Sequence, residues 1–157
     1  MRMREFSSWL SATPVSHVIQ RTSGAIADIQ VIHILSLTIL FALALNLSLR
    51  IAGRGLAIES LPSLAARFVP AIWICLGVLL LSGGLLIIAE PGRTITNSVF
   101  YLKMGLLLVQ VVITVWLATV ARRQSAQPTS LHVVAGVVYM VLWMGIIFAG
   151  RFIAYRL

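Results

Sequence analysis

The sequence predicts an all-α integral membrane protein, built as a four-helix up-down bundle with a short N-terminal interfacial helix. Of its 157 residues, 60% are hydrophobic and 10% are charged, and a soluble domain of this size could not bury so much apolar surface. A helix needs about 20 mostly apolar residues to cross the ~30 Å hydrocarbon core of a bilayer. Four segments meet this requirement, so we expect a single transmembrane domain over residues 1–157, with spans at about 25–49, 68–89, 99–120 and 131–154.

An interfacial segment is expected at residues 5–22, before the first span. Phe6, Trp9 and Leu10 give it an apolar side, and Arg2 and Arg4 suit anionic lipid headgroups. The apolar stretch is too short and too polar for the hydrophobic region of a cleavable signal peptide. Pro14 is expected to separate this helix from the next one.

The stretches between the spans are short, so adjacent helices should pack antiparallel. They also carry the residues that interrupt helices, namely Gly53, Gly55, Pro62, Pro91, Gly92 and Pro128. Four spans put both termini and the 90–98 stretch on one side of the membrane, where six arginines lie against five on the other side. If some arginines of the terminal side serve a site, the positive-inside rule puts the termini in the periplasm.

The formal net charge of +8 comes mainly from arginines at the ends of the spans. Lipid phosphates are the commoner partner of cations in such positions, so we expect membrane lipids, and no nucleic acid, as partners. Cys75 is the only cysteine, so the chain has no thiolate pair for a soft metal. The sequence has no Gly-rich phosphate loop, paired-cysteine zinc pattern or nucleophile elbow, which excludes a soluble-type catalytic module.

Ionisable residues gather at one end of the expected bundle. His33 interrupts the first apolar run, and Lys103 lies near the start of the third. With a rise of 1.5 Å per residue, they lie ~12 Å and ~6 Å inside their spans, so boundary shifts of a few residues put them in one layer. The same side carries a polar cluster and further cations: Asp28, Glu90, Arg21, His17 and Arg151.

Each of these residues also has an ordinary structural explanation. A lone lysine can extend its amine to the interface, and a lone histidine usually donates to a backbone carbonyl. Glu90 and Arg151 are common residue types at span ends. Their joint placement favours function, because an ionised group at a helix centre costs up to ~3 kcal/mol on insertion scales and only nearby partners reduce that cost. We therefore expect a one-sided intramembrane polar site.

Haem b is one cofactor that such a site could bind. His33 and His17 could ligate the iron together if the segment before the membrane folds back, whereas His132 lies at the far side. Alternatively, His33 alone holds a porphyrin whose propionates meet cations. The expected cofactor-binding residues are His33, Lys103, Arg151, Arg21 and His17, with His33 as the ligand of haem iron.

Three stretches carry the most distinctive patterns of the chain. They are Val31-Ile-His33-Ile-Leu-Ser in the first span, Asn97-Ser-Val-Phe-Tyr-Leu-Lys103-Met-Gly-Leu-Leu in the third, and Leu142-Trp-Met-Gly-Ile-Ile-Phe-Ala-Gly-Arg151-Phe-Ile-Ala-Tyr155 in the fourth. Together they resemble a family of small bacterial four-helix membrane proteins of unknown function. The resemblance covers nearly the whole chain, and the family is distantly similar to copper resistance protein D and to HemJ-type protoporphyrinogen oxidases.

The resemblance implies a location in the bacterial inner membrane and, as in the HemJ group, a b-type haem with essential roles for His33 and Lys103. The chain departs from HemJ proteins in its Gly150-Arg151-Phe152 ending and in the lack of a second matching intramembrane histidine. It also lacks the Met-rich or Cys-rich cluster of a copper path. We expect a haem-binding or redox role. One alternative is an accessory scaffold in a larger membrane complex or homo-oligomer. Another is transport of metal or a small solute without haem. Whether the chain is an enzyme stays open.

Overall fold

The computed structural model describes residues 2–54, 60–123 and 130–155, apart from the side chains of residues 2 and 153–155. Every regular element in these ranges is a helix: α1 (Arg2–Ser11), α2 (Pro14–Arg21), α3 (Ala25–Ile51), α4 (Leu61–Ala89), α5 (Pro91–Ile95), α6 (Ser98–Arg122) and α7 (Ser130–Tyr155). Four of them, α3, α4, α6 and α7, are long and apolar enough to cross a membrane. The predicted fold class, an all-α four-helix membrane bundle, is confirmed.

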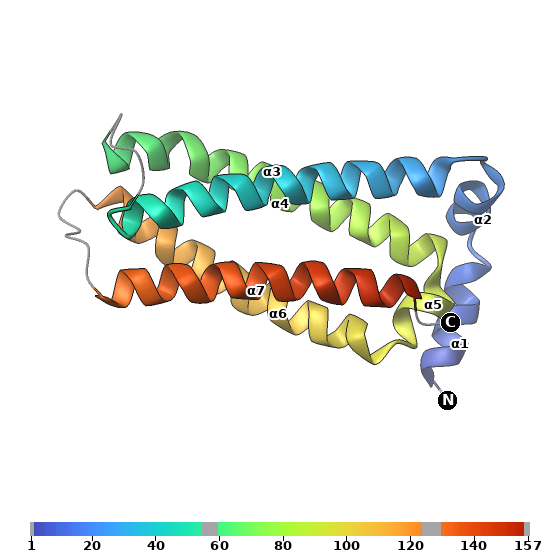
Figure 1. Cartoon of the computed structure of the whole chain (residues 1–157). Coiled ribbons are helices and arrows are strands. Elements are labelled where there is room, and N and C mark those ends of the chain that lie inside the picture. The colour runs from blue at the N-terminus through green and yellow to red at the C-terminus, as the bar shows by residue number, and fades with distance from the viewer. Residues whose placement is uncertain (1, 55–59, 124–129, 156–157) are drawn as a thin grey trace.

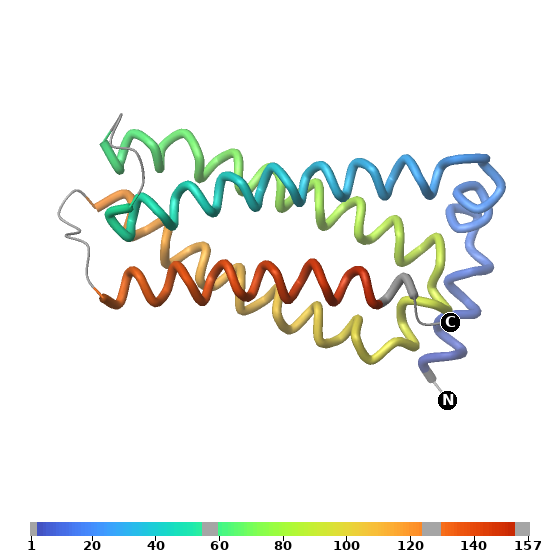
Figure 2. Tube along the Cα trace, viewed as in Figure 1, coloured from blue at the N-terminus to red at the C-terminus, as the bar shows by residue number. Residues whose placement is uncertain are grey.

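The four long helices run side by side, and α1, α2 and α5 lie together at one end of the bundle (Figure 1). The main helix pairs are α3 with α4 and α6 with α7. Figure 2 shows that α1 and α2 run across the bundle axis, as interfacial helices do. The rings of Phe6 and Trp9 stack on the exposed side of α1 with centroids 5.7 Å apart, where they suit a membrane surface.

The chain turns between α1 and α2 where Pro14 predicts a break. The Thr13 side chain caps α2 by accepting a hydrogen bond from the Ser16 N–H, and Pro14 opens the helix, where a missing N–H costs nothing. The turn from α2 into α3 passes through Gly24, whose φ of +86° favours glycine. The Gln20 amide donates to the Ala89 carbonyl at 2.7 Å, so α2 is fixed to the end of α4.

The helix of the second span begins before the predicted span. α4 starts at Leu61, and the span is expected from residue 68, because the Ser60 side chain caps the helix and Pro62 lies in its first turn, where it interrupts no hydrogen bond. The 90–98 stretch, expected to be a plain connection, contains α5, which starts at Pro91. These two prolines start helices instead of interrupting them. Pro128 lies outside the described residues.

The buried core occupies the half of the bundle that is remote from α1 and α2. Every buried side chain of α3 lies at or beyond Leu40, and every one of α6 lies at or beyond Gln110. The core includes Leu40, Ala44, Leu47, Val69, Ile72, Leu117, Tyr139 and Trp143. We call the other half, with residues 25–39 of α3, 98–109 of α6 and the facing ends of α4 and α7, the terminal half. His33 and Lys103 both lie in it.

Candidate functional site in the terminal half

His33 is held against α4. Its Nδ1 lies 2.8 Å from the Oγ of Ser82, and its Cε1 lies 3.4 Å from where a Cβ on Gly83 would be. Because Gly83 has no side chain, the imidazole ring can lie close to the α4 backbone. His33 is therefore a half-buried residue of the contact between α3 and α4.

The Ser82 hydroxyl determines which nitrogen of the neutral His33 ring carries the proton. Ser82 Oγ lies 2.7 Å from the carbonyl oxygen of Val78, which can only accept a hydrogen bond. That bond uses the single hydroxyl hydrogen, so Ser82 accepts the second bond and His33 Nδ1 donates it. Nε2 then carries the lone pair. Proteins orient metal-binding histidines in this way, with one ring nitrogen donating and the other free to bind.

Lys103 reaches the terminal half from α6. Its Nζ lies 3.4 Å from where a Cβ on Gly150 would be, so the amine rests against the backbone of α7. Among the described residues, no carboxylate pairs with Lys103 and no hydrogen bond involves its amine. Lys103 and His33 both lie in the terminal half, on α6 and α3 respectively. The site thus combines a histidine oriented by α4 with a half-buried cation that lies against α7.

The terminal half is open to the surrounding membrane. Ile32, Ile34 and Leu35, which flank His33 on α3, are each more than half exposed. On α6, Leu102 is 60% exposed beside Lys103. Protein covers these helix faces only in part, so an apolar ligand dissolved in the bilayer can approach the two ionisable groups from the side.

Glu90 and Asp28, the predicted acidic members of the site, lie nearer the end of the bundle. Glu90 ends α4, and its carboxylate forms an ion pair with Arg93 at 3.2 Å. Asp28 is exposed in the first turn of α3, where its N–H donates to the Gly24 carbonyl. Neither carboxylate forms an ion pair with Lys103.

The predicted cations beyond Lys103 are all exposed. His17 and Arg21 belong to α2, whose buried residue, Ser16, points elsewhere around the helix. Arg151 follows Gly150 near the end of α7. The structure thus places His33 and Lys103 in the terminal half and these three residues nearer the end of the bundle.

A second polar cluster lies in the buried half, and sequence reasoning did not assign it to a site. The Gln110 amide donates to the Tyr139 carbonyl at 3.1 Å, and the Tyr139 hydroxyl lies 2.9 Å from the Thr114 hydroxyl. Trp143 is 1% exposed, and its ring meets that of Tyr139 edge-on. One sequence signal points to this cluster: Gln110 and Thr114 follow Lys103 by seven and eleven residues, which puts all three on one face of α6.

The fold defines a multi-pass membrane protein, and the site adds an oriented histidine and a cation in one half of the bundle. The described part of the chain contains no group of three or more His, Cys, Asp or Glu side chains that could hold a metal ion by themselves. His132 contacts Trp116 at the opposite end from His33. Comparisons with protein-family models, curated proteins and solved structures give no match.

Proposed function

We propose that the terminal half binds haem b or a related porphyrin, with Nε2 of His33 as the iron ligand. The observation that carries this proposal is the hydrogen bond from His33 Nδ1 to Ser82, which holds the ring in place and leaves Nε2 with its lone pair. The bond fixes the orientation and the tautomer of the ring together. Ser82 is thereby the residue that positions the ligand nitrogen.

Lys103 supplies a second contact with the proposed ligand. An ammonium in the hydrocarbon layer is costly, by up to ~3 kcal/mol at a helix centre, and a nearby anion reduces that cost. Lys103 forms no ion pair with a described carboxylate, so an acidic group of the ligand would fill this role. A haem propionate is such a group. Arg151 lies closer to the bundle end, where it would meet a second propionate.

A porphyrin also suits a site with a single protein ligand. It brings its own in-plane nitrogen ligands, so one histidine is enough to attach it, whereas a bare metal ion would need a cluster of side chains. The faces of α3 and α6 beside His33 and Lys103 are partly exposed, so a planar apolar group could reach them from the bilayer. When bound, haem would supply one-electron redox chemistry. His33 and Ser82 would orient it, and Lys103 would balance its charge. We also propose the bacterial inner membrane as the location, with α1 and α2 on the periplasmic side.

An absorption spectrum of the purified protein tests the proposal. We expect a Soret band in the wild-type protein, expressed with a haem precursor and purified in a mild detergent. His33→Ala should lose this band. His132→Ala is the matched control, since His132 lies at the other end of the bundle, and it should keep the band. A folded but colourless wild-type protein would contradict haem binding and favour the accessory or transport roles.

A further inference from the structure

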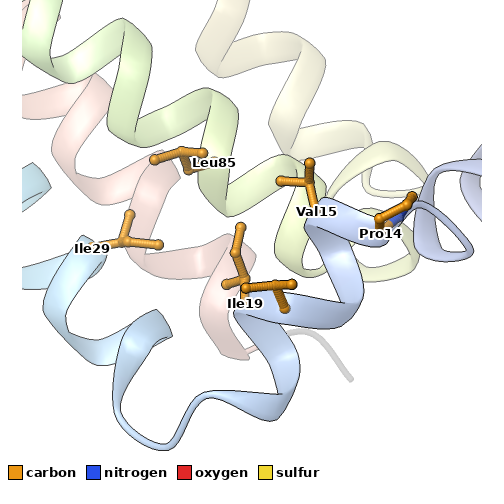
Figure 3. Close-up of a pocket in the computed structure, with 6 residues that line it drawn as sticks. Pro14, Val15, Ile19, Ile29 and Leu85 are labelled. Carbon is orange, nitrogen blue, oxygen red and sulfur yellow. The ribbon is translucent and has the colours of Figure 1, made fainter.

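An apolar groove lies between α2 and the adjacent ends of α3 and α4. Its volume is about 330 Å³, and six side chains line it: Pro14, Val15, Val18, Ile19, Ile29 and Leu85. Figure 3 shows the side chains of Ile19, Ile29 and Leu85 bordering a common space. We call it the α2 groove. No polar side chain lines it, so it suits a hydrocarbon chain.

The α2 groove lies at the outer edge of the apolar layer. Ile29 is the fifth residue of α3, and Leu85 lies four residues before the end of α4. Ile29 also lies one helical turn before His33, and Leu85 one turn after Ser82, so the groove lies just outside the His33 site. At this depth the acyl chain of a membrane lipid begins and its headgroup is within reach of α2.

A cation lies beside the groove. Arg21 follows Val18 by three residues, so the two side chains are neighbours on the surface of α2. Arg21 is exposed and forms no ion pair within the described part of the chain. Its position in the last turn of α2 places a positive charge where a lipid phosphate would lie.

The groove is fixed in place before any ligand arrives. The Gln20 amide joins α2 to the Ala89 carbonyl at the end of α4 and also donates to the Ser16 hydroxyl at 3.1 Å. Ser16 itself is fully buried. A preorganised groove binds more tightly than one that must form on binding, because less conformational entropy is lost.

We propose that the α2 groove is a specific site for one anionic phospholipid, whose acyl chain lies in the groove and whose phosphate contacts Arg21. This site is independent of haem. The wholly apolar lining suits an acyl chain, and the adjacent guanidinium, which has no ion pair among the described residues, gives a preference for an anionic headgroup. A zwitterionic lipid would gain the apolar contact of its acyl chain, but its neutral headgroup would gain less from the guanidinium of Arg21.

Native mass spectrometry of the full chain tests this site. Delipidated protein is titrated with phosphatidylglycerol and, separately, with phosphatidylcholine. We expect one phosphatidylglycerol to be retained about fivefold more tightly than phosphatidylcholine, which corresponds to the contribution of one arginine near an anionic surface. Arg21→Gln should remove this preference, and Arg21→Lys should keep most of it.

Two further variants separate the groove from general lipid contact. Val18 is 64% exposed, so Val18→Trp fills the groove without disturbing the fold, and it should abolish retention of this lipid. Val134→Trp fills a comparable apolar hollow between α6 and α7 at the far end and should have no effect. Arg4→Gln is the charge control on α1. Equal retention of both lipids by the wild type, loss with Arg4→Gln as large as with Arg21→Gln, or unchanged retention by Val18→Trp would overturn the proposal.

Discussion

Ser82 accepts a hydrogen bond from His33 while its own hydrogen stays on the Val78 carbonyl, so one serine of α4 fixes both the orientation and the tautomer of a histidine of α3. The serine needs no other partner for this, since the bond to the carbonyl four residues earlier is common for serine in apolar helices. The consequence is a lone pair on His33 Nε2 within the apolar layer. The two helices must keep their register for this nitrogen to be presented.

Removing the Ser82 hydroxyl should release the His33 ring. We expect Ser82→Ala to fold normally, to lower haem affinity by about 10-fold to 100-fold, and to mix the two ring tautomers, because the acceptor for Nδ1–H is lost. Haem titration followed at the Soret band measures the affinity, and ¹⁵N chemical shifts of the ring report the tautomer even without haem. Ser48→Ala is the control, because Ser48 is a buried serine of the other half. A single unchanged tautomer in Ser82→Ala would show that Ser82 does not set it.

The ammonium of Lys103 should lower the stability of the folded protein and should also bind a haem propionate. We expect Lys103→Met to raise the free energy of unfolding by about 1 kcal/mol or more. The substitution removes from the apolar layer an ammonium that pairs with no carboxylate among the described residues. The same variant should bind haem more weakly than the wild type, yet bind haem dimethyl ester equally well, since the ester has no charge to pair. Unfolding in mixed detergents and the two titrations measure these effects. An equal loss of affinity for both haems would argue against a propionate contact.

The absence of a side chain at Gly83 should matter only because His33 lies there. A Cβ at this position would lie 3.4 Å from His33 Cε1, so Gly83→Ala should be tolerated, whereas Gly83→Leu should displace the ring and break its bond to Ser82. Gly77 is the matched control on the same helix, because a Cβ there meets no atom within 4 Å. Gly77→Leu should be neutral or stabilise the helix by up to about 1 kcal/mol. Thermal unfolding with and without haem distinguishes the two positions.

The spans were predictable from the sequence, and the partners of the site residues were not. A run of about 20 apolar residues identifies a span wherever it occurs, and His33 and Lys103 stand out because they interrupt such runs. Ser82 and Gly83 do not stand out, since small residues are common wherever membrane helices pack. A helix that is apolar all round gives no periodic signal for its rotation, so the side that Ser82 presents to α3 was visible only in the structure.

The start of α4 illustrates a second limit of sequence reasoning. Hydropathy marks where a helix enters the membrane, and it put the second span at residue 68. The cap formed by Ser60 and the early proline Pro62 extend the helix to Leu61, outside the most apolar stretch. Capping residues therefore define this boundary, and reading Pro62 as a helix start would have found it.

The buried pair of Thr114 and Tyr139 should stabilise the half of the bundle that holds the core. Thr114 donates to the Gln110 carbonyl at 2.8 Å, so the Tyr139 hydroxyl must donate to Thr114, and each group is at most 4% exposed. We expect Thr114→Val to cost about 1–2 kcal/mol, because it leaves the Tyr139 hydroxyl without this acceptor in an apolar interior. Adding Tyr139→Phe should then cost little. A double-mutant cycle measured by unfolding in mixed detergents should give a coupling free energy of about 0.5–1.5 kcal/mol, the usual range for hydrogen bonds between membrane helices. Additive effects of the two substitutions would mean that the hydroxyls do not interact. The affinity for haem should be the same in all these variants, since neither residue lies in the terminal half.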